Sequence, residues 1–165
     1  MRSLEFDDVA TLELLARLVR IPSHRGVERQ EEGVAAALAG YLEGAGLEPN
    51  LTDVRPGRPN LLCALEGPEP GPHLVLCGHT DTVPLNDSEP GVGFSGEVKD
   101  GRLLGRGAAD MKGALAAMAT ALVALQRAGA PAAGRVTFAA VIDEEMESLG
   151  AEHLIASGFS ASSNQ

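Results

Sequence analysis

Segments with helical and with strand-like apolar spacing alternate along this chain, and this alternation constrains the fold more than any other feature. Residues 8–19 place apolar side chains three or four positions apart, as one face of a helix requires, and Pro22 ends the pattern. The same reasoning predicts helices over residues 27–45, 111–128 and 148–157. Strands are expected over residues 47–54, 60–65, 73–77 and 135–142. This order predicts an α/β fold with a mostly parallel central sheet flanked by helices.

Turn-forming residues separate these segments, but no linker divides the chain into domains. Asp100-Gly101 lies between two short apolar stretches and predicts a hairpin over residues 94–104. We expect one domain over residues 1–158 and a flexible tail over residues 159–165, where the residues are mostly small and polar.

The amino-acid composition argues against several classes of binding partner. Aromatic residues make up 3% of the chain, so stacking platforms for nucleic acid are lacking and the core must consist of Leu, Val and Ala. The formal charge of -10 comes without a Lys/Arg cluster, which argues against nucleic acid and anionic membranes as partners. No apolar stretch of membrane-spanning length and no signal-peptide pattern is apparent. Cys63 and Cys77 lie in predicted strands, which favours reduced thiols in a cytoplasmic protein.

The first candidate site segment is GHTDTVP, which follows the apolar segment HLVLC. We interpret HLVLC as a buried strand, so His79 and Asp81 would stand at its carboxyl end, where ligands bind in open α/β sheets. Asp81 could fix the ring orientation of a metal-binding His79. Alternatively, both residues are solvated members of a loop.

The second segment, GRGAADMKG, places Asp110 just before a long Ala- and Leu-rich helix. Asp110 could be a ligand, or it could simply cap the helix N-terminus. Lys112 could bind a substrate carboxylate, although a solvated side chain is the simpler expectation. The segment matches neither the phosphate-binding loop G-x-x-x-x-G-K-[ST] nor the dinucleotide motif G-x-G-x-x-G, which argues against a nucleotide binder.

The third segment ends the predicted strand of residues 135–142 with Asp143, Glu144 and Glu145. Adjacent carboxylates repel one another unless cations or hydrogen-bond donors lie near them. A metal ion would explain the cluster, and so would an acidic turn that opens the next helix.

Together, a His, an Asp and a Glu-Glu pair at strand ends form a ligand set suited to Zn²⁺, Co²⁺ or Mn²⁺. From LVRIPS through GHTDTVP, DGRLLGRGAADMKG and DEE, the chain resembles the metallopeptidases and deacylases that include acetylornithine deacetylase, succinyl-diaminopimelate desuccinylase, aminoacylase and glutamate carboxypeptidase. The resemblance implies that residues 1–158 are the amino-terminal part of a zinc-exopeptidase-like catalytic domain, which holds two Zn²⁺ ions when complete. It also implies that His79 and Glu145 bind one metal each, that Asp110 bridges both, that Asp81 orients His79 and that Glu144 is the general base.

Members of that family are roughly twice as long, with a further carboxylate ligand, a His ligand near the carboxyl terminus and a dimerisation domain, none of which matches a segment here. His24, His73 and His153 match no family position. The implied function is metal-dependent hydrolysis of N-acyl amino acids or peptides by a full-length, possibly homodimeric enzyme, with little activity expected from these 165 residues alone. The alternative is a non-catalytic metal-binding or interaction module that retains the fold.

Overall fold

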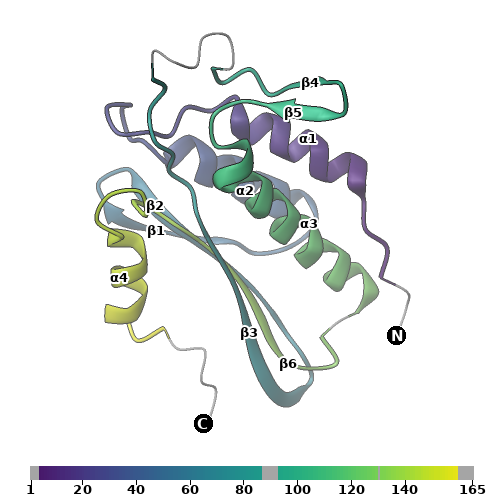
Figure 1. Cartoon of the computed structure of the whole chain (residues 1–165). Coiled ribbons are helices and arrows are strands. Elements are labelled where there is room, and N and C mark those ends of the chain that lie inside the picture. Colours follow the sequence, from purple (N-terminus) through teal and green to yellow (C-terminus); the bar gives the residue numbers. More distant parts are fainter. Residues whose placement is uncertain (1–3, 87–92, 130, 160–165) are drawn as a thin grey trace.

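The computed structural model describes residues 4–86, 93–129 and 131–159, and Figure 1 shows their arrangement. A four-stranded sheet has the strand order β1-β2-β6-β3, and a separate hairpin pairs β4 with β5. In chain order the elements are α1 (Asp8–Val19), α2 (Glu32–Gly44), β1 (Asn50–Arg55), β2 (Arg58–Glu66), β3 (Glu69–His79), β4 (Glu97–Lys99), β5 (Arg102–Leu104), the irregular turn η1 (Ala108–Lys112), α3 (Gly113–Ala128), β6 (Ala133–Val141) and α4 (Leu149–Ala156).

The α/β class with a helix-flanked sheet is confirmed, but the expected parallel majority is wrong for the described strands. β1 pairs with β2 and β2 with β6 in antiparallel fashion, and only β3 and β6 are parallel. The reason is that β6, which is the last strand of this sheet in chain order, enters the sheet between β2 and β3.

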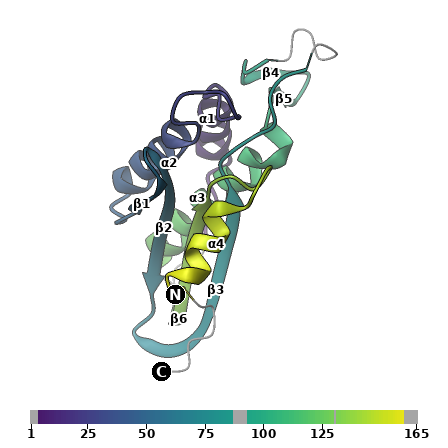
Figure 2. The ribbon, with the colours of Figure 1, turned by 90° about the vertical axis from the view of Figure 1, so that its left-hand side faces the viewer.

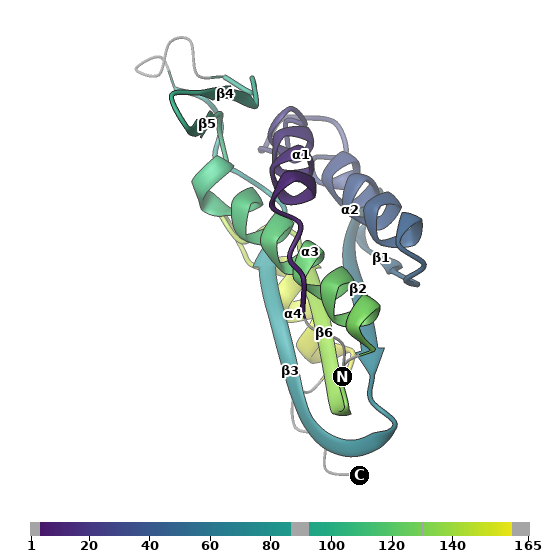
Figure 3. The same ribbon diagram turned by 90° about the vertical axis from the view of Figure 1, so that its right-hand side faces the viewer.

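Helices cover the two faces of the sheet unequally. Figures 2 and 3 show α1, α2 and α3 on one face and α4 alone on the other. Alternate residues of β6 face opposite sides, as the two-residue period of a strand requires. Phe138 and Ala140 join the large Leu-, Val- and Ala-rich core under α1–α3, whereas Ala139 and Val141 pack with Leu154 of α4.

The hairpin around Asp100-Gly101 is confirmed, with Lys99 opposite Arg102. The starts of two helices, however, differ from the expected ones. Helix α2 begins at Glu32, because residues 27–31 form turns in which Arg29 and Gln30 adopt positive φ values. Before α3, the backbone departs from helical angles at Asp110.

The prediction that HLVLC is a buried strand is also wrong, because its residues are half-buried or exposed. Leu74 is 54% exposed and Cys77 is exposed, because β3 lies at the edge of the described sheet. The two cysteines are free, as expected.

Residues 108–128, which comprise η1 and α3, contain an 18-residue stretch with a mean hydropathy of 1.4 and are long enough to cross a membrane. However, this segment carries Asp110 and the buried Lys112, and Leu115, Leu122 and other side chains of α3 contribute to the core. We therefore assign it as a core helix. Of the predicted tail, residues 160–165 lie outside the described residues, and Phe159 packs its ring edge against His73.

Candidate metal centre

The carboxyl ends of β3 and β6 coincide, which brings two of the three candidate segments together. These strands are parallel neighbours, and His79 at the end of β3 lies opposite Val141 at the end of β6. Parallel strands place their following residues at the same edge of the sheet. Glu144 and Glu145 therefore lie near His79, and η1 brings Asp110 to the same edge.

Three contacts hold the His79 ring and backbone. The Nδ1 atom lies 3.0 Å from the carbonyl oxygen of Asp81, and Nε2 lies 3.1 Å from Oδ1 of Asp110. The backbone N–H of His79 donates to the sulfur of Met111 at 3.3 Å. Burial alone would lower the pKa of His79, but the carboxylates of Asp81 and Asp110 outweigh it and raise that pKa to about 9. Because the Asp81 carbonyl lies against Nδ1, Nε2 is the nitrogen that faces Asp110 and Glu144.

Asp81 is buried and connects His79 to the glutamates. One carboxylate oxygen accepts the backbone N–H of Glu144 and the other that of Glu145, each at 3.0 Å. The carboxylate also lies 3.5 Å from Nδ1 of His79, farther than its own carbonyl. Burial would raise the pKa of Asp81, but the hydrogen bonds from His79 and the two N–H groups lower it below its usual value. Asp81 thus contacts His79 and also fixes the turn that carries the glutamates, a second contact that no local sequence pattern indicates.

His79, Asp110 and Glu145 each present a ligand atom, and these atoms all lie within 4.8 Å of one another. Nitrogen and oxygen ligands bound to one tetrahedral ion at about 2.1 Å lie roughly 3.4 Å apart, so these residues fit a divalent metal. Capping does not explain Asp110, because Lys112 occupies the N-cap position of α3 and no side chain caps that helix. The Asp110 side chain is 78% exposed to solvent, and its carboxylate lies 3.1 Å from Nε2 of His79.

Glu144 lies on the open side of this group. Its Oε2 is 3.7 Å from Nε2 of His79, and its side chain is 55% exposed. A carboxylate in this position can approach a water held between it and the ligands. This location is suitable for a group that exchanges protons with a reacting molecule.

Asp143 has a different partner. Its Oδ1 lies 2.7 Å from Arg58, which also forms two hydrogen bonds, of 2.7 and 2.6 Å, to Glu31. The repulsion expected among three adjacent acids is therefore relieved for one of them by Arg58. Glu31 falls within the helix predicted over residues 27–45, and no sequence pattern singles out Arg58. Their pairing across 27 residues has no local signal.

Lys112 is buried, which contradicts the expectation of a solvated side chain. It is fully excluded from solvent, and its Nζ donates to the carbonyl of Ile21 at 2.7 Å. Burial lowers the pKa of Lys112 to about 8. The backbone departs from helical angles at Asp110 and Met111, so the direction of the Lys112 side chain does not follow from a regular helix start.

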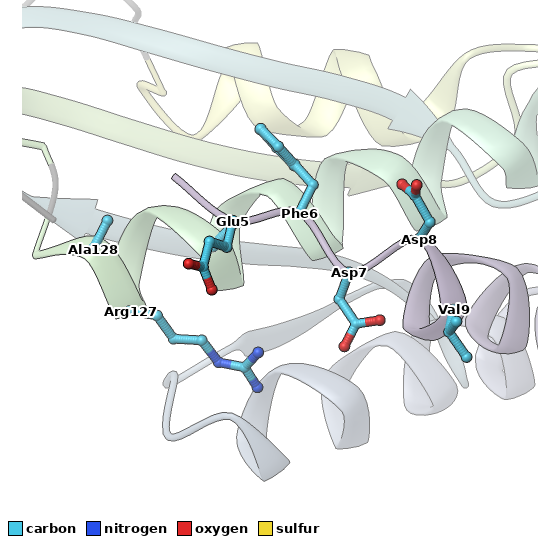
Figure 4. A pocket seen from close by; sticks show the side chains of 8 residues that line it. Glu5, Phe6, Asp7, Asp8, Val9, Arg127 and Ala128 are labelled. Atoms are coloured by element: carbon cyan, nitrogen blue, oxygen red, sulfur yellow. The ribbon is translucent and has the colours of Figure 1, made fainter. Parts of the chain in front are cut away.

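The other histidines are not part of the ligand group found among the described residues. His24 stacks on Phe94, His73 contacts Thr137 at 2.8 Å and His153 lies on α4. A surface groove of about 830 Å³ lies between residues 5–9 and the end of α3, near Arg127, and shares no residue with the metal-ligand group (Figure 4). Its size therefore does not identify it as the site of chemistry.

A family model for peptidase family M20/M25/M40 matches residues 75–164, which include the three candidate metal ligands together with Asp81 and Glu144. The chain belongs to this family. It is 41% identical over 136 residues to succinyl-diaminopimelate desuccinylase of Bradyrhizobium sp. (strain ORS 278), an alignment that covers 78% of this chain and 34% of that relative. The chain thus spans about a third of the length of the curated relatives it matches.

Solved structures agree with this assignment. Aminopeptidase PepT from Bacillus cereus superposes with a TM-score of 0.69 at 26% identity, over 89% of this chain and 39% of that one. YXEP from Bacillus subtilis, described as a dinuclear metal binding peptidase, superposes with a TM-score of 0.63 at 20% identity, over 92% of this chain and 36% of that one. The latter likeness concerns the fold alone.

Proposed function

We propose that this chain supplies the amino-terminal part of a metal-dependent hydrolase that cleaves N-acyl amino acids or peptides at an amide bond. The observation that carries the proposal is the convergence of His79, Asp110 and Glu145, with ligand atoms within 4.8 Å of one another and Glu144 beside them. Nitrogen and oxygen ligands favour Zn²⁺, with Co²⁺ or Mn²⁺ as alternatives.

Divalent metal held by His79, Asp110 and Glu145 would supply Lewis acidity that polarises the scissile carbonyl and acidifies a bound water. Glu144 is our candidate general base, which accepts the proton of the attacking water and passes it to the leaving amine. Asp81 keeps the peptide groups of Glu144 and Glu145 in place through its two 3.0 Å hydrogen bonds. It also orients His79 so that Nε2 faces the metal position.

The substrate class follows from the relatives. One is a succinyl-diaminopimelate desuccinylase and another an aminopeptidase, so both acylated amino acids and peptides are substrates within the family. Each has an amide bond whose cleavage needs an activated water and a proton for the departing nitrogen. We extend this class to a full-length protein that contains the present chain, which we place in the cytoplasm and expect to form a homodimer.

The test joins this chain to the carboxyl-terminal part of the Bradyrhizobium desuccinylase and measures hydrolysis of N-succinyl and N-acetyl amino acids. Glu144→Gln should retain metal and lose about 10²–10⁴-fold in kcat, because an amide cannot accept the water's proton. The control is Glu152→Gln, which alters an exposed acid on α4 and should leave kcat unchanged.

If Glu144→Gln retains normal turnover, the role of Glu144 is wrong. If the joined protein binds no metal and hydrolyses neither substrate, this chain is the non-catalytic module.

A further inference from the structure

A buried ionic cluster lies directly behind the turn of the metal centre. Arg58, at the start of β2, bridges the carboxylates of Glu31 and Asp143. The Glu31 side chain is fully buried, that of Asp143 is 8% exposed and that of Arg58 19% exposed. The three residues come from the segment before α2, from β2 and from the segment after β6. This cluster therefore ties three distant parts of the chain to one guanidinium group.

Asp143 passes this constraint on to the turn that follows it. It adopts a positive φ of 65°, a conformation that side chains other than glycine rarely take. Its carbonyl accepts the N–H groups of Glu147 and Ser148 at 3.2 and 2.6 Å, and its Oδ2 accepts the Glu147 N–H at 3.3 Å. The carboxylate is thus shared, with one oxygen on Arg58 and the other inside the turn.

The turn containing Glu144 and Glu145 is therefore held from two sides. Asp81 binds the N–H groups of Glu144 and Glu145 from the side of His79. Arg58 binds Asp143 from the opposite side, through a hydrogen bond of 2.7 Å. With both contacts in place, the direction in which the two glutamate side chains leave the backbone is defined.

Stability alone does not account for such a cluster. Desolvation of buried charges offsets much of their attraction, so apolar residues of similar size serve a core equally well or better. A guanidinium with a fixed, forked set of donors does provide geometry, because it can bind two carboxylates in a defined arrangement. The placement of Arg58 behind the metal-ligand turn points to that geometric use.

We propose that Arg58, anchored by Glu31, is a positioning residue that acts through Asp143 to fix the Glu144–Glu145 turn for metal binding and proton transfer. The link to metal and catalysis rests on the proposed function. The positioning itself is a property of the metal-free chain and can be measured without any ion.

The experiment compares the wild-type chain with Arg58→Lys, which keeps the positive charge but lacks the forked donors. Amide hydrogen exchange is followed by NMR in metal-free protein, and Co²⁺ affinity is measured by titration. The matched control is Arg29→Lys, because Arg29 lies in the neighbouring segment and forms an exposed ion pair with Glu32. Asp143→Asn serves as the second variant if Arg58→Lys does not fold.

We expect exchange at the amides of Glu144, Glu145 and Glu147 to accelerate at least tenfold in Arg58→Lys, while amides in the centre of β6 keep their protection. Co²⁺ affinity should fall at least tenfold, and Arg29→Lys should match wild type in both measurements. Unchanged exchange at the turn, or a uniform rise across the domain that follows lost stability, would overturn the inference. If the wild-type chain binds no Co²⁺, the proposed function fails while the exchange data still decide the positioning role.

Discussion

Replacement of Asp81 by Asn tests the connection between the His79 segment and the glutamate turn. The variant keeps the size and shape of a side chain that is 1% exposed. It removes the charge and converts one of two acceptor oxygens into an NH₂ group. That group must then face a backbone N–H, either of Glu144 or of Glu145, where the carboxylate now accepts at 3.0 Å.

The cost can be worked out from these contacts. A hydrogen bond to a charged group contributes about 1.5–3 kcal/mol, and one of the two is lost outright while the other becomes neutral. We therefore expect the free energy of unfolding to fall by about 3 kcal/mol, which corresponds to a drop in Tm of roughly 6–12 °C for a domain of this size. The pKa of His79 should fall below its value of about 9, because the Asp81 carboxylate is the largest of the influences that raise it.

Urea unfolding at pH 7 and NMR titration of the His79 ring measure the two effects. Asp53→Asn is the matched control, since Asp53 also accepts a backbone N–H, that of Gly57 at 3.0 Å, but is exposed. The control should change stability by about 0.5 kcal/mol or less. If Asp81→Asn is as stable as the control and the pKa of His79 is unchanged, the connecting role assigned to Asp81 is refuted.

Two further predictions concern residues around the centre. Burial lowers the pKa of Lys112 from 10.5 to about 8, so the folded chain binds fewer protons than the unfolded chain between these values. Wild-type stability relative to Lys112→Met should therefore rise by about 3 kcal/mol as pH increases from 8 to 10.5, and pH-dependent urea unfolding of both proteins would show a constant difference if Lys112 were solvated. Gly150→Ala should lose about 2–4 kcal/mol by urea unfolding, because its Cβ would lie 2.4 Å from the backbone N of Ile142, whereas Gly40→Ala, which meets nothing within 4 Å, should not lose stability.

The sequence predicted those features that depend on neighbouring residues. Apolar spacing located the helices and strands, and Asp100-Gly101 located a hairpin whose two turn residues both have positive φ values. The carboxyl-end argument correctly predicted that the segments of His79 and Glu145 would meet, because that follows from any pair of adjacent parallel strands.

The predictions that failed concern features that depend on contacts between residues far apart in the sequence. Nothing in the segment Arg58–Glu66 indicates that β6 would pair with it, and this insertion reversed the expected balance of parallel and antiparallel pairs. The burial of Lys112 depends on the carbonyl of Ile21, 91 residues away. The role of Arg58 depends equally on Glu31 and Asp143, so single-segment patterns could not reveal it.

The contacts of Asp143 favour Glu144 over Asp143 as the proposed general base. As the first of the three adjacent acids, it would be the alternative to Glu144 on sequence alone. Its carboxylate is instead buried against Arg58 and an N–H of the turn. Glu144, with a half-exposed side chain near Nε2 of His79, is therefore the residue we propose as the base.

Metal binding by the purified chain tests the central claim most directly. Calorimetric titration with Zn²⁺ and Co²⁺ should detect one specific site per chain, and the variant with His79, Asp110 and Glu145 all replaced by Ala should lose it. His153→Ala, which changes a histidine on α4 outside the ligand group, should bind as wild type does. Equal affinity in the wild type and the triple variant would contradict the account, because the metal would then bind elsewhere or at no defined site.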